Sequence, residues 1–261
     1  MITSTSNPKI QYIRSLVSKK QFREENHAFI VEGVRLVEEV QRAMQKPKII
    51  IYSQKLSQRG KKLVSAFQEM KVECEEIAEN VMDSLTDTET AQGILAVLPF
   101  PEIPFPKKPD FLVIADEIRD PGNLGTILRS SLSAGVQGMI LTPGTVDAFS
   151  PKVVRSGMGS QLFLPIQTLG WEAIETQFKK TLQPPLHFYF TTSKEGNPHW
   201  KKDFSQPLAL IIGGEAEGVT PEAIRVADES VQIPMPGKTE SLNAAVAAGI
   251  LIFEVVRQRS K

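Results

Sequence analysis

The stretch that decides the fold is FLVIADEIRDPGNLGTILRSSLSAGVQGMIL, residues 111–141. It opens on an almost continuous apolar run, passes through Asp-Pro-Gly-Asn, continues with a helical pattern that Gly135 ends, and closes on a second apolar run. We expect a strand, a helix capped by Asn123, and a second strand. Apolar runs of this kind are typical of parallel strands that are buried on both faces.

The same alternation continues to the C terminus. Further strands are expected at LFLPI (162–166), HFYFTTS (187–193), LALIIGG (208–214) and VQIPM (231–235). KVVRSGMGS (152–160) is consistent with a helix or a loop, and helices are expected at WEAIETQFKKTL (171–182), PEAIRVAD (221–228) and SLNAAVAAGILIFEVVRQR (241–259). This order predicts an α/β domain around a parallel sheet, whose ligands bind beyond the carboxyl ends of the strands.

A proline-rich segment separates this region from the front of the chain. PFPEIPFPKKP, residues 99–109, holds five prolines, which favour an extended connector. We therefore predict an N-terminal domain over 1–100, a linker over 101–109 and a second domain over 110–261. The front domain combines a helical pattern, IVEGVRLVEEVQRAM (30–44), with the strand-like runs KIIIYS (48–53) and GILAVLP (93–99), which predicts a small α/β domain.

Composition excludes several classes of protein. Hydrophobic residues make up 41% of the chain and charged residues 23%, as in ordinary globular proteins. No apolar run approaches the roughly 20 residues of a membrane span, and the start, MITSTSNPKI, lacks the apolar core of a signal peptide, so a cytoplasmic protein is expected. Cys74 is the single cysteine, and His27, His187 and His199 lie far apart, so we expect no metal.

The formal net charge is zero, which excludes a global attraction to nucleic acid. The first 23 residues nevertheless contain five basic residues and no acid. Two interpretations stay open: a phosphate-facing arm, or a solvated amphipathic helix. The basic residues are Lys9, Arg14, Lys19, Lys20 and Arg23.

Gly-Lys-Thr at 237–239 is similar to the end of a nucleotide-binding P-loop. However, Gln232 stands where the motif requires its first glycine. Pro234 and Pro236 also remove two backbone N–H donors from the loop that would surround the phosphates. A P-loop is therefore rejected.

Glycines also follow the expected strand at 208–214, in IIGGEAEGV. A dinucleotide fingerprint is absent, and Glu215 and Glu217 would repel a pyrophosphate. The loop is better suited to a hydroxyl, an amino group or a cation. Its glycines, Gly213, Gly214 and Gly218, serve either as turn residues or as a close approach to a flat ligand.

Two other loops carry polar residues at expected helix starts. Asn123 is either a helix cap or a functional amide, and Arg129 either pairs with a carboxylate or is presented to an anion. Ser241 and Asn243 precede the last helix and could likewise be caps. The small residues after them indicate a helix that packs closely against the domain or a second subunit.

Together the three loops resemble the SpoU branch, or TrmH family, of knotted RNA methyltransferases, over about residues 110–258. The family has an Asn followed six residues later by Arg, then Gly-x-Glu-x-x-Gly, then Ile-Pro-Met and Ser-Leu-Asn. The front domain is similar to a substrate-binding module that itself resembles a ribosomal protein. The matching positions are Asn123 with Arg129; Gly213, Glu215 and Gly218; Ile233, Pro234 and Met235; and Ser241, Leu242 and Asn243.

The resemblance implies methyl transfer from S-adenosylmethionine to a ribose 2′-hydroxyl of RNA, with ribosomal RNA favoured over transfer RNA. It implies a deep C-terminal trefoil knot and a homodimer. It also implies two sets of site residues. The catalytic set is Arg129, Asn123, Glu215, Ser241 and Asn243, and the cofactor set is Thr191, Gly213, Gly214, Gly218, Ile233, Pro234, Met235 and Leu242.

Arg129 is the catalytic arginine by resemblance. A guanidinium stays protonated at neutral pH, so an orienting and electrostatic role fits it better than that of a general base. Three alternatives stay open: action on transfer RNA, methylation of a base nitrogen, and an RNA-binding paralogue without turnover.

Overall fold

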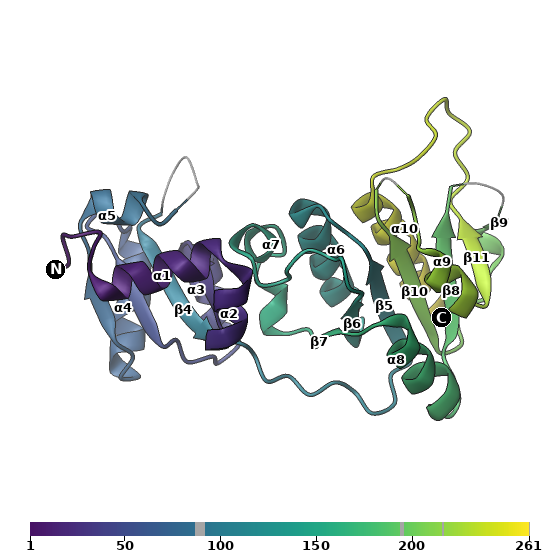
Figure 1. The fold of residues 1–261 in the computed structure, drawn as a ribbon, viewed down its shortest axis with the longest axis horizontal. Helices are drawn as coiled ribbons and strands as arrows, with labels where there is room; N and C mark the ends of the chain where they lie inside the picture. The colour runs from purple at the N-terminus through teal and green to yellow at the C-terminus, as the bar shows by residue number, and fades with distance from the viewer. Residues whose placement is uncertain (87–91, 194–195, 216, 261) are drawn as a thin grey trace. The chain divides into compact units, whose positions relative to one another are not determined.

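The computed structural model describes residues 1–86, 92–193, 196–215 and 217–260, and the chain forms two compact units (Figure 1). The first unit consists of Met1–Glu102 together with Asp147–Leu162, and the second of Ile103–Val146 together with Phe163–Lys261. The first boundary therefore falls inside the proline-rich segment. The division differs from the expected domain of 110–261, because residues 147–162 pack with the first unit. No helix among the described residues is long and apolar enough to cross a membrane.

A four-stranded sheet forms the middle of the first unit. Its strand order is β1-β4-β2-β3, in which β4 runs antiparallel to both of its neighbours and β2 and β3 are parallel. Its elements are α1 (Pro8–Ser18), α2 (Lys20–Asn26), β1 (Ala28–Glu32), α3 (Val34–Arg42), β2 (Ile49–Tyr52), α4 (Gln58–Glu69), β3 (Cys74–Glu76), α5 (Glu79–Asp83), β4 (Ile94–Pro99), α7 (Pro151–Ser156) and η1 (Ser160–Leu162).

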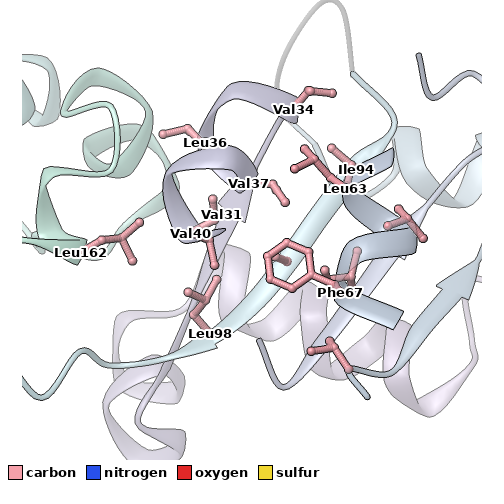
Figure 2. Packing of buried hydrophobic residues seen from close by; sticks show 14 of the residues in the cluster. Val31, Val34, Leu36, Val37, Val40, Leu63, Phe67, Ile94, Leu98 and Leu162 are labelled. Atoms are coloured by element: carbon pink, nitrogen blue, oxygen red, sulfur yellow. The ribbon is translucent and has the colours of Figure 1, made fainter. Parts of the chain in front are cut away.

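Alternation along the strands places apolar side chains on both faces of this sheet. On one face Phe67 of α4 packs with α3 and β4, and Figure 2 shows Leu162 in the same cluster. Leu162 and Val154 are almost fully buried there, which explains why residues 147–162 belong to this unit. On the other face α1 buries Ile10 and neighbours at helical spacing.

The helical pattern expected over 30–44 is wrong at its start. Residues 30–32 belong to strand β1, and α3 begins only at Val34. Gly33 separates the two elements with a φ of 99°, a backbone conformation that a residue with a side chain rarely adopts. Apolar residues at 30 and 31 fit either period, so spacing alone could not place this boundary.

The second unit contains a seven-stranded sheet with the order β7-β6-β5-β10-β8-β11-β9. Every pairing in it is parallel, which confirms the prediction of an α/β domain around a parallel sheet. The trefoil knot stays a prediction. The elements are β5 (Phe111–Asp116), α6 (Pro121–Ser133), β6 (Gly138–Leu141), β7 (Ile166–Thr168), α8 (Trp171–Glu175), η2 (Thr176–Thr181), β8 (His187–Thr192), β9 (Asn197–Pro198), η3 (His199–Lys201), β10 (Leu208–Gly213), α9 (Pro221–Val226), β11 (Glu229–Gln232) and α10 (Ala244–Arg259).

Helices cover both faces of this sheet. One face packs Leu112, Ile114 and Ile211 against α8, η2 and α9. The alternate residues of these strands face the opposite layer, where α6 and α10 pack against each other and α10 contacts β10. The sheet is therefore a buried layer whose strand ends lead into exposed loops.

Several local expectations for this unit need correction. The strand expected at 231–235 ends at Gln232, and the last helix begins at Ala244 rather than at 241. The side chain of Asp120, rather than Asn123, caps α6 by accepting a hydrogen bond from the Asn123 backbone N–H at 2.8 Å. The strand expected at 162–166 is β7, at Ile166–Thr168. The apolar residue at the start of the expected strand is not part of β7. Leu162 ends a 3-10 turn and packs in the core of the first unit.

Candidate active site

A pocket of about 470 Å³ opens at the carboxyl ends of β8, β10 and β11. This volume falls in the range of small-molecule sites, and the location is the one expected for a parallel sheet. Three carboxylates, Glu215, Glu217 and Glu240, line it, and the described lining residues include no Lys, Arg or His. The pocket therefore suits a ligand that carries positive charge, as the sequence of the glycine loop indicated.

Most of the expected cofactor residues lie in this pocket. Pro234 is the exception among the eight, since it is not one of the described lining residues. The lining residues also include some that sequence reasoning missed, among them apolar side chains of α10 such as Ala247 and Leu251. The expected residues that line the pocket are Thr191, Gly213, Gly214, Gly218, Ile233, Met235 and Leu242.

The glycine loop, residues 213–220, forms one wall; Ala216 lies outside the described residues. The Gly218 N–H donates to the Gly214 carbonyl at 3.1 Å, which folds the loop back on itself. A Cβ at Gly213 would lie 2.2 Å from the Gly218 carbonyl carbon, so the loop closes this tightly only with glycine there. Glycine is required at position 213 because the loop packs against itself there, which favours the interpretation of Gly213 as a turn residue.

A chain of side-chain hydrogen bonds joins the three loops. The Asn123 amide N–H donates to a Glu215 carboxylate oxygen at 2.5 Å, and the Asn123 oxygen accepts from the Asn243 amide at 2.8 Å. The Asn243 oxygen caps α10, accepting from the Ala245 and Val246 backbone N–H groups. Asn243 therefore caps a helix and also contacts Asn123 in another loop, while its catalytic role stays a prediction.

Ser241 and Arg129 have different positions. Ser241 lines the pocket, exposed, two residues before the Asn243 cap. Arg129 is exposed on α6, about 240° around the helix axis from Asn123, and is not one of the described lining residues. Its guanidinium makes no hydrogen bond or ion pair with any residue that the structure describes. A carboxylate partner for Arg129 is thus not found among the described residues, and its presentation to an anion stays a prediction.

Asp116 is a buried carboxylate that the sequence analysis did not select. It ends strand β5, is fully buried, and accepts hydrogen bonds from Thr142, Trp171 and the Thr220 backbone. The available signal was an acidic residue directly after the apolar run FLVIA, because a buried acid needs partners. Thr220 ends the glycine loop, which connects Asp116 to the pocket wall.

Most of the basic residues near the N terminus are engaged within the first unit. Lys9 pairs with Glu73 and Glu75, and the Arg14 guanidinium donates to Ser84. Arg23 is buried, against Asp147 and two carbonyls of the α1 end. The amphipathic-helix interpretation of this segment is therefore the better one, since few of its charges are left to face phosphate.

Comparison with known proteins now gives the family. Residues 110–253 match the SpoU rRNA methylase family, and residues 7–96 match an MRM3-like substrate-binding domain. The chain belongs to the SpoU rRNA methylase family. The family expected from the three loops is thus confirmed, as is its enzyme class, a methyltransferase.

Similar proteins cover almost the whole length of this SpoU-family chain. The 23S rRNA (guanosine(2553)-2′-O)-methyltransferase RlmP of Bacillus subtilis is 32% identical, over 97% of this chain and 98% of its own length. The structure of AviRb from Streptomyces viridochromogenes in complex with AdoMet has a TM-score of 0.89 at 28% identity, covering 98% of this chain and 99% of that one. An AdoMet-bound rRNA methyltransferase from Sinorhizobium meliloti has a TM-score of 0.84 at 30% identity, covering 98% and 97%.

Proposed function

We propose that this chain transfers the methyl group of S-adenosylmethionine to a ribose 2′-hydroxyl of ribosomal RNA. The observation that supports this best is the chain of hydrogen bonds from Glu215 through Asn123 to Asn243. It connects the three motifs of the family beside a pocket at the strand ends. Two of the relatives named above, from Bacillus subtilis and Sinorhizobium meliloti, are named as rRNA methyltransferases, which favours ribosomal RNA over transfer RNA.

The pocket residues fit S-adenosylmethionine. The cofactor carries a sulfonium and an ammonium group, and the described lining offers three carboxylates and no cationic side chain. Ile233, Met235 and Leu242 supply apolar surface for a flat adenine, and the glycine loop supplies backbone groups. When bound, the sulfonium supplies an activated methyl group, so the chemistry calls for no metal.

The residues of this chain would then orient the nucleophile. A ribose hydroxyl is a weak nucleophile, so it must be aligned with the methyl group and its developing negative charge must be stabilised. We assign the charge stabilisation to Arg129, whose guanidinium is exposed and free of carboxylates among the described residues. Asn123, Asn243 and Glu215 hold the loops in register, and Ser241 faces the pocket, where its hydroxyl can contact the ribose.

We further propose that the protein is a homodimer. Val246, Ile250 and Phe253 are between 37% and 51% exposed, and their spacing places them on one face of α10. An exposed apolar stripe of this kind is typical of an interface between subunits. Because α6 packs against α10, a partner on this face would lie near Arg129.

The first unit is proposed to bind RNA, and the protein is proposed to be cytoplasmic.

Methyl transfer from tritiated S-adenosylmethionine to unmethylated ribosomal RNA tests the activity. Nuclease digestion and mass spectrometry then locate the methyl group. We expect a 2′-O-methylated nucleotide in ribosomal RNA. Methylation of a base nitrogen, preference for transfer RNA, or no transfer at all would each replace this proposal by one of the three alternatives.

Sedimentation of Phe253→Asp tests the dimer. A carboxylate within the apolar stripe should shift the protein from dimer to monomer. Met44→Asp is the matched control, because Met44 is 86% exposed but lies in the first unit. A Phe253→Asp protein that sediments like the wild type would exclude α10 as the interface.

A further inference from the structure

One buried side chain reaches both ends of the glycine loop. At the far end, the Thr220 backbone N–H donates to Asp116 Oδ2 at 2.7 Å. This bond fixes the residue at which the loop ends and α9 begins, since Thr220 also caps α9 through its own hydroxyl. Asp116 is fully buried, and the Thr220 backbone N–H at the end of the loop has this carboxylate as its acceptor.

The near end of the loop depends on Asp116 through Thr142. The Thr142 hydroxyl donates to Asp116 Oδ1 at 3.0 Å and accepts from the Glu117 backbone N–H at 3.1 Å. Glu117 has a φ of 51°, so its carbonyl is turned out of the line of strand β5. Gly214 lies directly against that carbonyl: a Cβ at Gly214 would be 2.7 Å from the Glu117 oxygen.

The third donor to Asp116 comes from a residue outside the glycine loop. Trp171 Nε1–H donates to Oδ1 at 3.2 Å from α8, in the helical layer of the other face. The carboxylate thus receives two donors that set the loop, one directly and one through Glu117, and a third donor that belongs to the core. This division makes it possible to separate a role in the loop from a role in stability.

We propose that Asp116 is the positioning residue of the cofactor site, holding the glycine loop in the shape that binds S-adenosylmethionine. The inference rests on the proposed function for the identity of the ligand. Asp116 itself is not a lining residue of the pocket and acts only through Thr220 and Glu117. It should therefore affect the affinity for the cofactor and leave the affinity for RNA unchanged.

Replacing one oxygen by an amide gives the sharpest test. Two fixed N–H donors, Trp171 Nε1–H and the Thr220 backbone N–H, face opposite oxygens of Asp116. In Asp116→Asn a single oxygen cannot serve both, so one donor meets an NH₂ group. Adding Trp171→Phe removes the competing donor. The amide oxygen can then face Thr220 while the NH₂ group donates to the Thr142 hydroxyl.

Titration calorimetry of each folded variant with S-adenosylmethionine measures its Kd for the cofactor. We expect Kd to rise about tenfold in Asp116→Asn and to change less than about twofold in Trp171→Phe. In the double variant, Kd for S-adenosylmethionine should return to within about threefold of its value in Trp171→Phe. If Asp116 had a purely structural role, the two substitutions should instead add their effects and raise Kd further. Thermal melts of each variant confirm folding. The KM for RNA should be the same in all of them.

A second pair keeps the proposal testable if Asp116→Asn does not fold. Thr142→Val removes support from Glu117, whereas Trp171→Phe removes a donor to the same oxygen from the core side. Of these two variants, only Thr142→Val should raise Kd for S-adenosylmethionine, by severalfold. Equal effects in this pair, a double variant as weak as Asp116→Asn, or wild-type affinity in Asp116→Asn would overturn the proposal. Failure of the wild type to bind the cofactor would instead overturn the proposed function.

Discussion

Asn243 offers a prediction in which two roles of one side chain can be measured apart. Its oxygen caps α10 through two backbone N–H groups, and its amide donates to Asn123. Replacing a capping Asn by Ala costs about 1 kcal/mol. The exposed bond to Asn123 adds about 0.5 kcal/mol or more. Asn243→Ala should therefore lower the free energy of unfolding by about 1.5 kcal/mol, or the Tm by about 3–6 °C.

Asn243→Asp separates the two roles. Aspartate caps a helix as well as asparagine does, so stability should stay within about 0.5 kcal/mol of the wild type. The new carboxylate, however, faces the Asn123 oxygen. If the Asn123 side chain turns so that its NH₂ group donates to the new carboxylate, its oxygen then faces the Glu215 carboxylate. Asn123 therefore loses its contact either with residue 243 or with Glu215. The loops then lose their register, and misplaced reacting groups should lower kcat by about tenfold or more.

Urea unfolding gives the stability of the two variants, and single-turnover methyl transfer gives the rate. The expected pattern is a destabilised Asn243→Ala and a stable but slow Asn243→Asp. Wild-type kcat in a stable Asn243→Asp would refute the role of the hydrogen-bond chain. Wild-type stability in Asn243→Ala would refute the cap.

Three further predictions concern other parts of the chain. Arg129→Ala should keep stability and cofactor affinity but lose methyl transfer by on the order of a hundredfold, measured with tritiated cofactor; near-normal transfer would contradict the assignment. Bidentate contact with Arg257 lowers the pKa of Glu254 to about 2. The ionised acid therefore stabilises the fold above about pH 5, and this contribution is lost as the pH falls toward 2. Urea unfolding should show Glu254→Gln less stable than the wild type at pH 7 and about equal to it near pH 2, whereas a gap that does not change with pH would contradict the reasoning. Arg23→Met should destabilise by about 3 kcal/mol, because it leaves Asp147 uncompensated, and Arg23→Met with Asp147→Leu should recover much of that loss in chemical denaturation.

Local patterns predicted the strands and the loops at their ends better than they predicted the packing. Apolar runs and glycines located β5, β8 and β10 and their loops, because both signals depend on neighbours in the sequence. Asn123 and Asn243 were selected from helix starts, although their bond to each other crosses 120 positions. That contact depends on tertiary structure, which spacing does not encode.

The misses have the same cause. Asp116 is a single acid whose partners come from three other segments, so the apolar run before it indicates a buried acid but not the groups that surround it. The boundary between β1 and α3 was misplaced, because Ile30 and Val31 fit a helix and a strand equally well. The basic residues near the N terminus were correctly counted, but their acidic partners lie far along the chain, as for Lys9 and Glu73.

The grouping of residues 147–162 with the first unit affects how this protein can be divided. A cut at the proline-rich segment looks natural, yet a fragment starting there would keep this segment and lose its packing partners. Leu162 and Val154 would be uncovered, and Arg155 would lose Glu32, to which it donates at 2.9 Å. Chimeras that exchange the front domain between relatives should therefore carry residues 147–162 with it, as a two-segment graft.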